Sequence, residues 1–259
     1  MPHIRTWETV TSALAASDAG LSDAENAHQH GVAVKTIRRW RRIYQRRGQI
    51  RGQPHTCVPC PRCEGASVDE SANAELLGWY LGDGYISSTA KGVYGLHIYN
   101  DLAHPLLNAH IRDLMGRVKP GGRPHQRATR GVMITTVSWK HWPCLFPQHG
   151  PGRKHERAIV LDRWQQEIVD AHPADLLRGL FHSDGSRTAN WATRVVAGAS
   201  KRYDYPRWEF VNRSEDILQI CTDALDLVGI QWRRPRVTAV AVSRRDDVRR
   251  LDALIGLKS

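Results

Sequence analysis

Two stretches of the chain share a run of apolar residues that ends in Asp-Gly. The first is LLGWYLGDGY, residues 76–85, and the second is LLRGLFHSDGSR, residues 176–187. Each run has the composition of a buried helix, and an Asp-Gly pair is a turn signal. We therefore predict two matching helices that stop at Gly84 and Gly185, with both glycines in the left-handed conformation that commonly ends a helix.

The hydrophobic patterns that follow the two runs also correspond. Each copy continues with a strand, a second strand that ends near Asn100 or Asn212, an amphipathic helix, an alternating strand and a closing helix. In the first copy these segments include VYGLHIYN, LAHPLLNAHIRDLMG and VMITTVSW, and in the second RWEFVN, EDILQICTDALDLVG and RVTAVAVSR. Matched units about one hundred residues apart predict an internal repeat with the order α-β-β-α-β-α.

The two predicted helices carry small residues on one face. Gly78 and Gly82 are four residues apart in the first helix, as are Gly179 and Ser183 in the second. Residues at this spacing share a helix face. A glycine inside a helix costs about 1 kcal/mol relative to alanine, and close packing of two backbones is the compensation that we expect. We predict that the helices lie side by side about a pseudo-twofold axis and end at one level.

This arrangement makes Asp83 and Asp184 neighbours at two helix C-termini. A helix C-terminus carries partial negative charge, so an acid there is unfavourable unless a positive group lies beyond it. Two adjacent carboxylates also repel each other. We expect a divalent metal ion to supply the missing positive charge. The alternative is a pair of ordinary helix ends that face solvent.

Residues 1–50 predict a separate helical domain. In LSDAENAHQHGVAVKTIRRWRRIYQRRG, a helix capped by Ser22 runs to Gly31, and a second helix starts near Val34. The spacing of Ala27, Gly31, Ile37 and Trp40 resembles a DNA-binding helix-turn-helix, in which a small residue lets the helices cross and glycine makes the turn. The residues expected to face inward are Ala27, Ile37, Trp40 and Tyr44. The residues expected to contact DNA are Lys35, Thr36, Arg38, Arg39, Arg41 and Arg42. The alternative is a basic helix whose charges are only solvated.

Residues 51–70 predict a Cys-rich linker, because RGQPHTCVPCPRCEGASVDE is dense in Pro, Gly and Cys. Cys60 and Cys63 have the C-x2-C spacing of a zinc knuckle, but a second such pair is missing. A structural zinc site could close locally through His55, Cys57, Cys60 and Cys63. It could instead take ligands from KHWPCLFPQHGPGRKHER, which offers His141, Cys144, His149 and His155. The alternative is reduced thiols in a loop.

The charge of the chain favours a polyanionic partner. Lys and Arg number 37 against 26 Asp and Glu, a net charge of +11. Nucleic acid is the partner that we expect, and an anionic membrane surface is the competing interpretation. No run approaches the length of a transmembrane helix, and the opening MPHIRTWETV lacks the apolar core of a signal peptide. We therefore expect a cytoplasmic protein without a membrane span.

The paired motifs and the repeat order resemble the single-chain, two-motif LAGLIDADG homing endonucleases over residues 71–259. The resemblance implies an α+β fold of two α-β-β-α-β-α units, residues 71–160 and 161–259. It also implies a monomer with internal pseudo-twofold symmetry and two curved antiparallel sheets that form a saddle over double-stranded DNA.

The resemblance also assigns site residues. The catalytic acids that bind Mg²⁺ fall on Asp83 and Asp184. The first acidic position of the family motif falls on Leu81 and His182 instead, a departure that affects packing more than metal binding. The basic residues that follow the last strand of each half are Lys140 and either Arg244 or Arg245. An arginine cannot act as a general base.

The implied function is sequence-specific, metal-dependent hydrolysis of DNA phosphodiesters that produces a double-strand break. Lys140 would stabilise the anionic transition state. A second hypothesis is a transcription regulator on the same scaffold that has lost cleavage, and a third is a maturase that binds RNA. Such regulators lose the metal-binding acids, whereas this chain keeps Asp83 and Asp184, which favours the nuclease.

Overall fold

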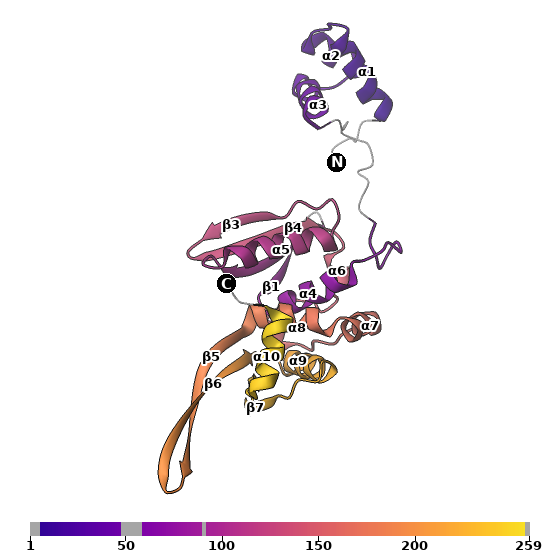
Figure 1. Ribbon diagram of the computed structural model, residues 1–259. Coiled ribbons are helices and arrows are strands. Elements are labelled where there is room, and N and C mark those ends of the chain that lie inside the picture. The colour runs from indigo at the N-terminus through magenta and orange to yellow at the C-terminus, as the bar shows by residue number, and fades with distance from the viewer. Residues whose placement is uncertain (1–5, 48–58, 90–91, 257–259) are drawn as a thin grey trace. The chain divides into compact units, whose positions relative to one another are not determined.

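A computed structural model describes residues 6–47, 59–89 and 92–256 (Figure 1). The chain divides into two compact units, Met1–Cys57 and Val58–Ser259. No helix in the described ranges is both long enough and apolar enough to cross a membrane.

The N-terminal unit contains α1 (Trp7–Asp18), α2 (Asp23–Gln29) and α3 (Val34–Arg47). Ser22 caps α2 in a capping box with Glu25, as its sequence suggests. Gly31, in the turn before α3, has a φ of +58°, a conformation that favours glycine. The core consists of Val10, Ala13, Leu14, Ala27, Ile37 and Trp40. The predicted inward side chain of Tyr44 lies outside the described residues. The sequence pattern missed α1.

The second unit contains two halves with the same order of elements. The first half has α4 (Glu70–Leu81), β1 (Gly84–Ser88), β2 (Tyr94–Asp101), α5 (Pro105–Val118), β3 (His125–Thr129), β4 (Val132–Trp139) and α6 (Trp142–Leu145). The connection contains the short helix η1 (Lys154–Glu156) and α7 (Arg163–Ala171). The second half has α8 (Pro173–Asp184), β5 (Gly185–Val196), β6 (Ala199–Val211), α9 (Glu215–Leu227), β7 (Arg233–Arg236), β8 (Ala239–Val242) and α10 (Arg245–Ile255).

The internal repeat is real, but its predicted order lacks one strand in each half. The observed order is α-β-β-α-β-β-α, and the antiparallel sheets run β1-β2-β4-β3 and β5-β6-β8-β7. The missed strands β3 and β7 have the sequences HQRAT and RRPR. Both are mostly exposed at a sheet edge, so they lack the apolar alternation by which a half-buried strand is recognised. The protein is thus a mixed α/β fold with two four-stranded sheets.

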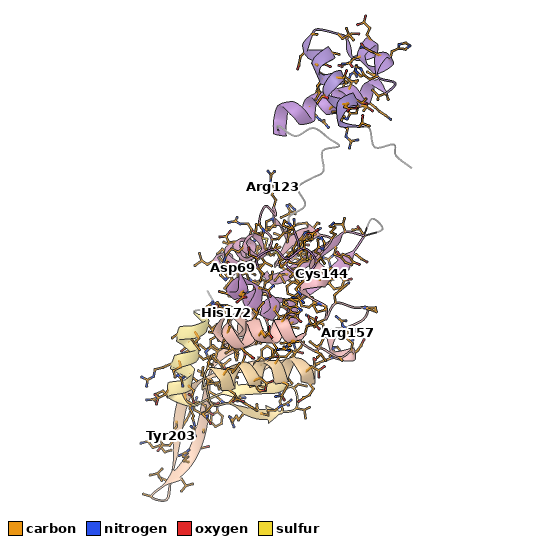
Figure 2. The ribbon with its side chains drawn as sticks, turned by 90° about the vertical axis from the view of Figure 1, so that its right-hand side faces the viewer. Asp69, Arg123, Cys144, Arg157, His172 and Tyr203 are labelled. Carbon is orange, nitrogen blue, oxygen red and sulfur yellow. The ribbon has the colours of Figure 1, made fainter. Side chains whose placement is uncertain are left out.

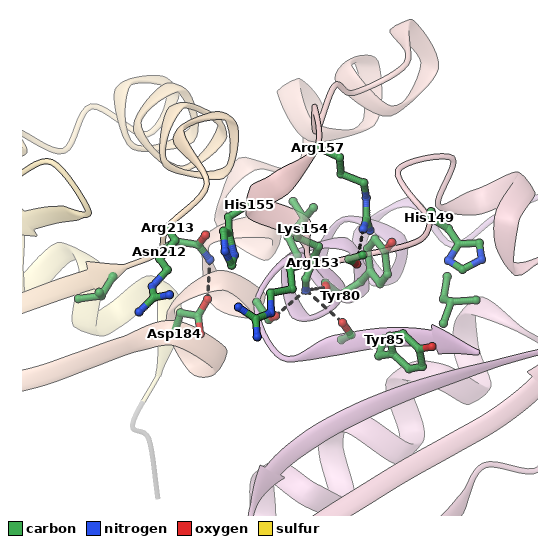
Figure 3. A pocket seen from close by; sticks show the side chains of 17 residues that line it. Tyr80, Tyr85, His149, Arg153, Lys154, His155, Arg157, Asp184, Asn212 and Arg213 are labelled. Atoms are coloured by element: carbon green, nitrogen blue, oxygen red, sulfur yellow. Dashed lines mark hydrogen bonds between the residues drawn. The ribbon is translucent and has the colours of Figure 1, made fainter. Parts of the chain in front are cut away.

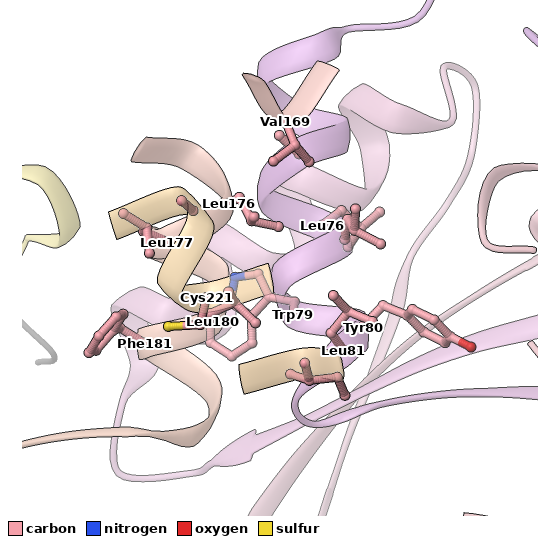
Figure 4. Close-up of a cluster of buried hydrophobic side chains, with 14 of the residues drawn as sticks. Leu76, Trp79, Tyr80, Leu81, Val169, Leu176, Leu177, Leu180, Phe181 and Cys221 are labelled. Atoms are coloured by element: carbon pink, nitrogen blue, oxygen red, sulfur yellow. The ribbon is translucent and has the colours of Figure 1, made fainter. Parts of the chain in front are cut away.

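Helices α4 and α8 form the centre of the second unit (Figure 4). Every residue of α4 from Ala72 to Leu81 is buried, and Leu76 and Trp79 pack in one cluster with Leu176 and Leu180 of α8. Burying an apolar side chain of this size contributes about 1.5 to 3 kcal/mol, so this cluster is a large part of the stability of the unit.

The helices meet backbone to backbone at their glycines. A Cβ on Gly78 would lie 2.8 Å from the Leu180 nitrogen and overlap the Leu176 oxygen. A Cβ on Gly179 would lie 2.8 Å from the Trp79 nitrogen and overlap the Glu75 oxygen. Neither neighbour can rotate away, because both are main-chain atoms. Glycine is therefore required at both positions by space.

The prediction that Gly84 and Gly185 adopt the left-handed conformation is wrong. Gly84 lies outside the positive-φ region, and Gly185 has φ −89° and ψ 150°. Glycine is needed at these positions because a side chain would strike the preceding turn. A Cβ would lie 2.8 Å from the Tyr80 oxygen at Gly84 and 2.7 Å from the Phe181 Cα at Gly185. The chain turns directly from each helix into its first strand.

Candidate functional site

The two acids lie where the central helices end. Asp184 is the last residue of α8, whereas α4 ends at Leu81 and Asp83 follows in the turn before β1. The Asp184 Oδ2 atom lies 3.3 Å from where a Cβ on Gly82 would stand, so this carboxylate lies against the turn that carries Asp83. The glycine contact between the helices is what permits this approach.

Lys154 in η1 is the basic residue at this site that the sequence analysis missed. Its Nζ donates hydrogen bonds to three main-chain oxygens at the end of α4, those of Tyr80 (2.5 Å), Gly82 (2.6 Å) and Gly84 (3.1 Å) (Figure 3). An ammonium therefore satisfies the negative end of α4. Lys154 is therefore one positive group at this helix end, and a divalent metal ion at the two acids stays a prediction.

Burial and the two acids act on Lys154 in opposite directions. Burial disfavours the charged form and lowers the pKa of Lys154 to about 8, while the carboxylates of Asp184 and Asp83 raise it. Both acids are thus close enough to Lys154 to stabilise its charge. At neutral pH the ammonium form still dominates, and it loses its proton as the pH rises through about 8.

A cleft of about 560 Å³ lies over the helix ends. Besides Asp184, it is lined by cationic and imidazole side chains from the connection and from the end of β6. These are His149, Arg153, Lys154, His155, Arg157 and Arg213. Arg157 is held by the loop itself, because its guanidinium donates to the carbonyl oxygens of Gln148 (3.2 Å) and Gly152 (2.8 Å). Arg153 and Arg213 are exposed, so they can bind an anion.

The halves hold their acids differently. In the second half, Asn212 Nδ2 donates a 2.8 Å hydrogen bond to Asp184 Oδ2. Asn100 has the corresponding place at the end of β2, but its amide donates to Asn108 Oδ1 of α5 at 3.0 Å. The first half instead holds the turn of Asp83 through the main chain, since the Tyr99 nitrogen donates to the Asp83 oxygen at 3.3 Å.

The two basic residues assigned by the family resemblance, Lys140 and Arg245, lie outside this cleft. Lys140 is exposed in the turn after β4, and Arg245 is exposed at the start of α10 after the N-cap Arg244. Neither Lys140 nor Arg245 lines the cleft. Leu81 is fully buried, and His182 stacks on Trp79 with centroids 6.0 Å apart, so both of these positions serve packing.

A second cluster of potential ligands lies at α6. The ligand atoms of Cys60, Cys63, His141 and Cys144 are all within 4.8 Å of one another. His55 and Cys57, proposed from sequence as local ligands, lie outside the described residues. His149 and His155 line the cleft over the acids and do not belong to this cluster.

The predicted DNA-contacting residues of the N-terminal unit lie on the outer face of α3. Lys35, Arg38, Arg39, Arg41 and Arg42 are exposed, and Thr36 is half-buried. The Asp23 carboxylate of α2 accepts hydrogen bonds from Arg38 Nε (3.1 Å) and Arg41 (2.8 Å). These pairs attach one edge of α3 to α2, and the interpretation as a helix-turn-helix stays a prediction.

The β5–β6 hairpin presents aromatic and cationic side chains to solvent. Trp191 and Tyr203 are exposed on it, and Tyr203 lies far along the hairpin (Figure 2). The Arg202 guanidinium lies 5.1 Å from the centroid of the Trp191 ring, and the Lys201 ammonium lies 5.5 Å from that of Tyr203. Flat rings next to cations suit contacts with bases and phosphates.

No family model matches the chain, and no curated protein matches it. Similar solved structures include variants of the homing endonuclease I-DmoI, with 14% identity, coverage of 73% of this chain and 97% of that chain, and a TM-score of 0.47. The LAGLIDADG meganuclease I-AabMI bound to uncleaved DNA has 12% identity, coverage of 70% and 82%, and a TM-score of 0.43. The N-terminal LAGLIDADG domain of DUF199/WhiA has 16% identity, coverage of 74% and 83%, and a TM-score of 0.44.

Proposed function

We propose that this protein is a sequence-specific DNA endonuclease of the LAGLIDADG homing type, which hydrolyses phosphodiester bonds with a divalent metal ion. One observation carries the proposal: the glycine contact between α4 and α8 brings Asp184 against the turn of Asp83, beneath a cleft lined by cations. Acids that hold a metal and cations that hold a phosphate are the two requirements of this chemistry.

The donor set fits Mg²⁺ or Mn²⁺. Asp83 and Asp184 offer carboxylate oxygens, which hard divalent cations prefer, and the cleft has no thiol among its lining residues. When bound, such an ion supplies Lewis-acid activation of water and neutralises charge on the leaving oxygen. The protein contributes the positions of the two acids. Asn212 donates a hydrogen bond to Asp184 Oδ2 and so fixes the orientation of this carboxylate.

The cations of the cleft would bind the DNA backbone. Arg153 and Arg213 are exposed on opposite elements, the connection and the end of β6, and can each bind a phosphate oxygen. Lys154 is held by the end of α4, and its charge below pH 8 offsets the repulsion between the two acids. The net charge of +11 and the cationic hairpin would extend binding over many phosphates.

The experiment uses purified full-length protein and a plasmid that carries the genomic sequence flanking its own gene. With Mg²⁺ we expect linearisation, which EDTA prevents. Asp83→Asn and Asp184→Asn each remove a metal-binding carboxylate and should abolish linearisation while DNA binding persists. Asp113→Asn removes an exposed acid on α5 and should cleave normally. Cleavage that survives loss of both Asp83 and Asp184 would contradict the proposal.

A second function is a DNA-binding regulator on a scaffold that does not cleave. One observation favours it: Lys154 already supplies a positive charge at the end of α4, so both acids have a structural role without any metal ion. This function predicts tight, sequence-specific binding of the flanking DNA, with no nicking in Mg²⁺ or Mn²⁺. Preference for structured intron RNA over the same DNA would favour the maturase instead.

A further inference from the structure

We propose that Cys60, Cys63, His141 and Cys144 bind one structural Zn²⁺ ion, which fastens the first residues of the second unit to α6. The site is independent of the acids and of the proposed cleavage. Three sulfurs and one imidazole are a common ligand set for tetrahedral zinc, and four protein ligands leave no open position for a substrate.

The distances between the ligand atoms suit one small ion. Zn–S bonds of about 2.3 Å and tetrahedral angles place two ligand atoms about 3.5 to 3.8 Å apart. The Cys63 and Cys144 sulfurs lie 3.3 Å apart, and Cys144 Sγ lies 3.7 Å from His141 Nδ1. All four ligand atoms lie within 4.8 Å of one another. Small movements of the side chains would therefore complete a tetrahedron.

The first pair of ligands lies in a tight turn that points both sulfurs the same way. The Glu64 nitrogen donates to the Cys60 oxygen at 2.9 Å, and the Cys60 nitrogen donates to Glu64 Oε2 at 2.6 Å. Gly65 leaves the turn with a φ of +66°, which only glycine adopts without strain. Local contacts thus build the C-x2-C knuckle before any ion binds.

The second pair comes from a helical turn distant in sequence. The Cys144 nitrogen donates to the His141 oxygen at 3.0 Å, so the first turn of α6 fixes the His-x2-Cys spacing. His141 is 9% exposed, and its Nε2 atom has no hydrogen-bond partner within the described part of the chain. The nitrogen that faces the cluster is Nδ1, which lies 3.7 Å from Cys144 Sγ, so a metal ion would bind there while the proton stays on Nε2.

Two other interpretations of the cluster fit less well. A disulfide between Cys63 and Cys144 would need a bond of about 2.05 Å, and it would leave Cys60 and His141 without a role. Inert core cysteine is the other interpretation, and Cys221 illustrates it. Cys221 is fully buried in α9 among apolar side chains and is absent from the cluster. Cys63, by contrast, is exposed, so packing does not explain its position.

The test is metal analysis of the full chain, purified under reducing conditions without chelator. We expect about one zinc per chain, and a cobalt-substituted sample should show the absorption of tetrahedral Co²⁺ with thiolate charge-transfer bands. Cys63→Ser and Cys144→Ser should lose most of the zinc, whereas Cys221→Ala should keep it. His141→Cys preserves a four-ligand set and should retain zinc, which separates ligation from folding.

Two results would overturn the proposal. One is a wild-type chain with fully reduced thiols that binds no zinc when the metal is added back. The other is a Cys144→Ser variant that keeps the wild-type zinc content and cobalt spectrum. Cleavage or DNA binding is not measured in this test, so its failure is distinguishable from failure of the proposed function.

Discussion

At the end of α4 in the first half, Lys154 of the connection donates three hydrogen bonds to main-chain oxygens. At the end of α8 in the second half, Asn212 donates to the carboxylate of Asp184 itself. The hairpins differ too, because β1 and β2 have 5 and 8 residues while β5 and β6 have 12 and 13. The halves are nevertheless equivalent where Gly78 meets Gly179. The contact between the two helices is therefore symmetric, whereas the polar contacts at the two helix ends differ.

The largest expected effect tests the symmetric contact. Gly179→Ala places a methyl against the Glu75 oxygen and the Trp79 nitrogen, and Gly78→Ala places one against the Leu176 oxygen. Overpacking against main chain cannot be relieved by rotamer changes, so each should lower the free energy of unfolding by about 3 kcal/mol or more. Urea denaturation followed by tryptophan fluorescence measures this.

Gly116→Ala is the matched control. Gly116 lies inside α5, and a Cβ there meets nothing within 4 Å. This change should raise the free energy of unfolding by about 0.5 to 1 kcal/mol, because alanine favours the helix. Equal losses for Gly179→Ala and Gly116→Ala would show that the two helices do not meet backbone to backbone.

The next largest effect tests the Lys154 ammonium at the end of α4. Lys154→Met removes a positive charge that both Asp83 and Asp184 face, so a divalent cation would no longer be repelled at this site. We expect the affinity for Mn²⁺ at pH 7 to rise at least about tenfold, or about 1.4 kcal/mol. Isothermal titration calorimetry measures it. Arg153→Met removes an exposed charge and should change the affinity less than about threefold.

The same lysine sets an expected pH dependence. Its pKa in the folded protein, about 8, lies below the ordinary lysine value, so raising the pH from 7 to 9 neutralises it. The protonated form opposes the metal ion, and Mn²⁺ affinity of the wild type should therefore rise across this window and level off above it. Lys154→Met has no such proton, and its affinity should be nearly flat. A parallel rise in both proteins would exclude Lys154 as the cause.

The smallest effect tests the asparagines. Asn212→Ala removes the 2.8 Å hydrogen bond to Asp184. One hydrogen bond to a charged group contributes about 1.5 to 3 kcal/mol, and water that enters the cleft of the variant would replace part of this. We expect about threefold to tenfold slower cleavage of one DNA strand. Asn100→Ala removes a bond to Asn108 and should leave both strand rates close to wild type. Strand-specific end labelling of the duplex reports the two rates, and equal slowing of both strands by either variant would refute the asymmetry.

Periodicity and repetition in the sequence were enough to predict the paired helices, the repeat and Asp184 at the end of α8. Asp83 was predicted inside the first helix and instead lies in the turn after it. An apolar run with Gly78 and Gly82 on one face has few ways to bury itself, so its pairing with Gly179 and Ser183 follows from local pattern. The C-x2-C spacing of Cys60 and Cys63 was also sufficient to predict a pair of metal ligands. The polar edge strands β3 and β7 could not be predicted in this way. They are strands because they pair with β4 and β8, and their own composition does not indicate it.

Only the tertiary structure decided which cation meets the acids and which residues complete the cysteine cluster. Lys154 lies in GPGRKHER, a loop whose charges look alike in sequence, yet its Nζ alone reaches the carbonyl oxygens of α4. His141 and Cys144 approach Cys60 and Cys63 across about eighty residues of chain. Sequence determines what each segment must bury, and the fold determines which distant polar groups then come within a few ångströms.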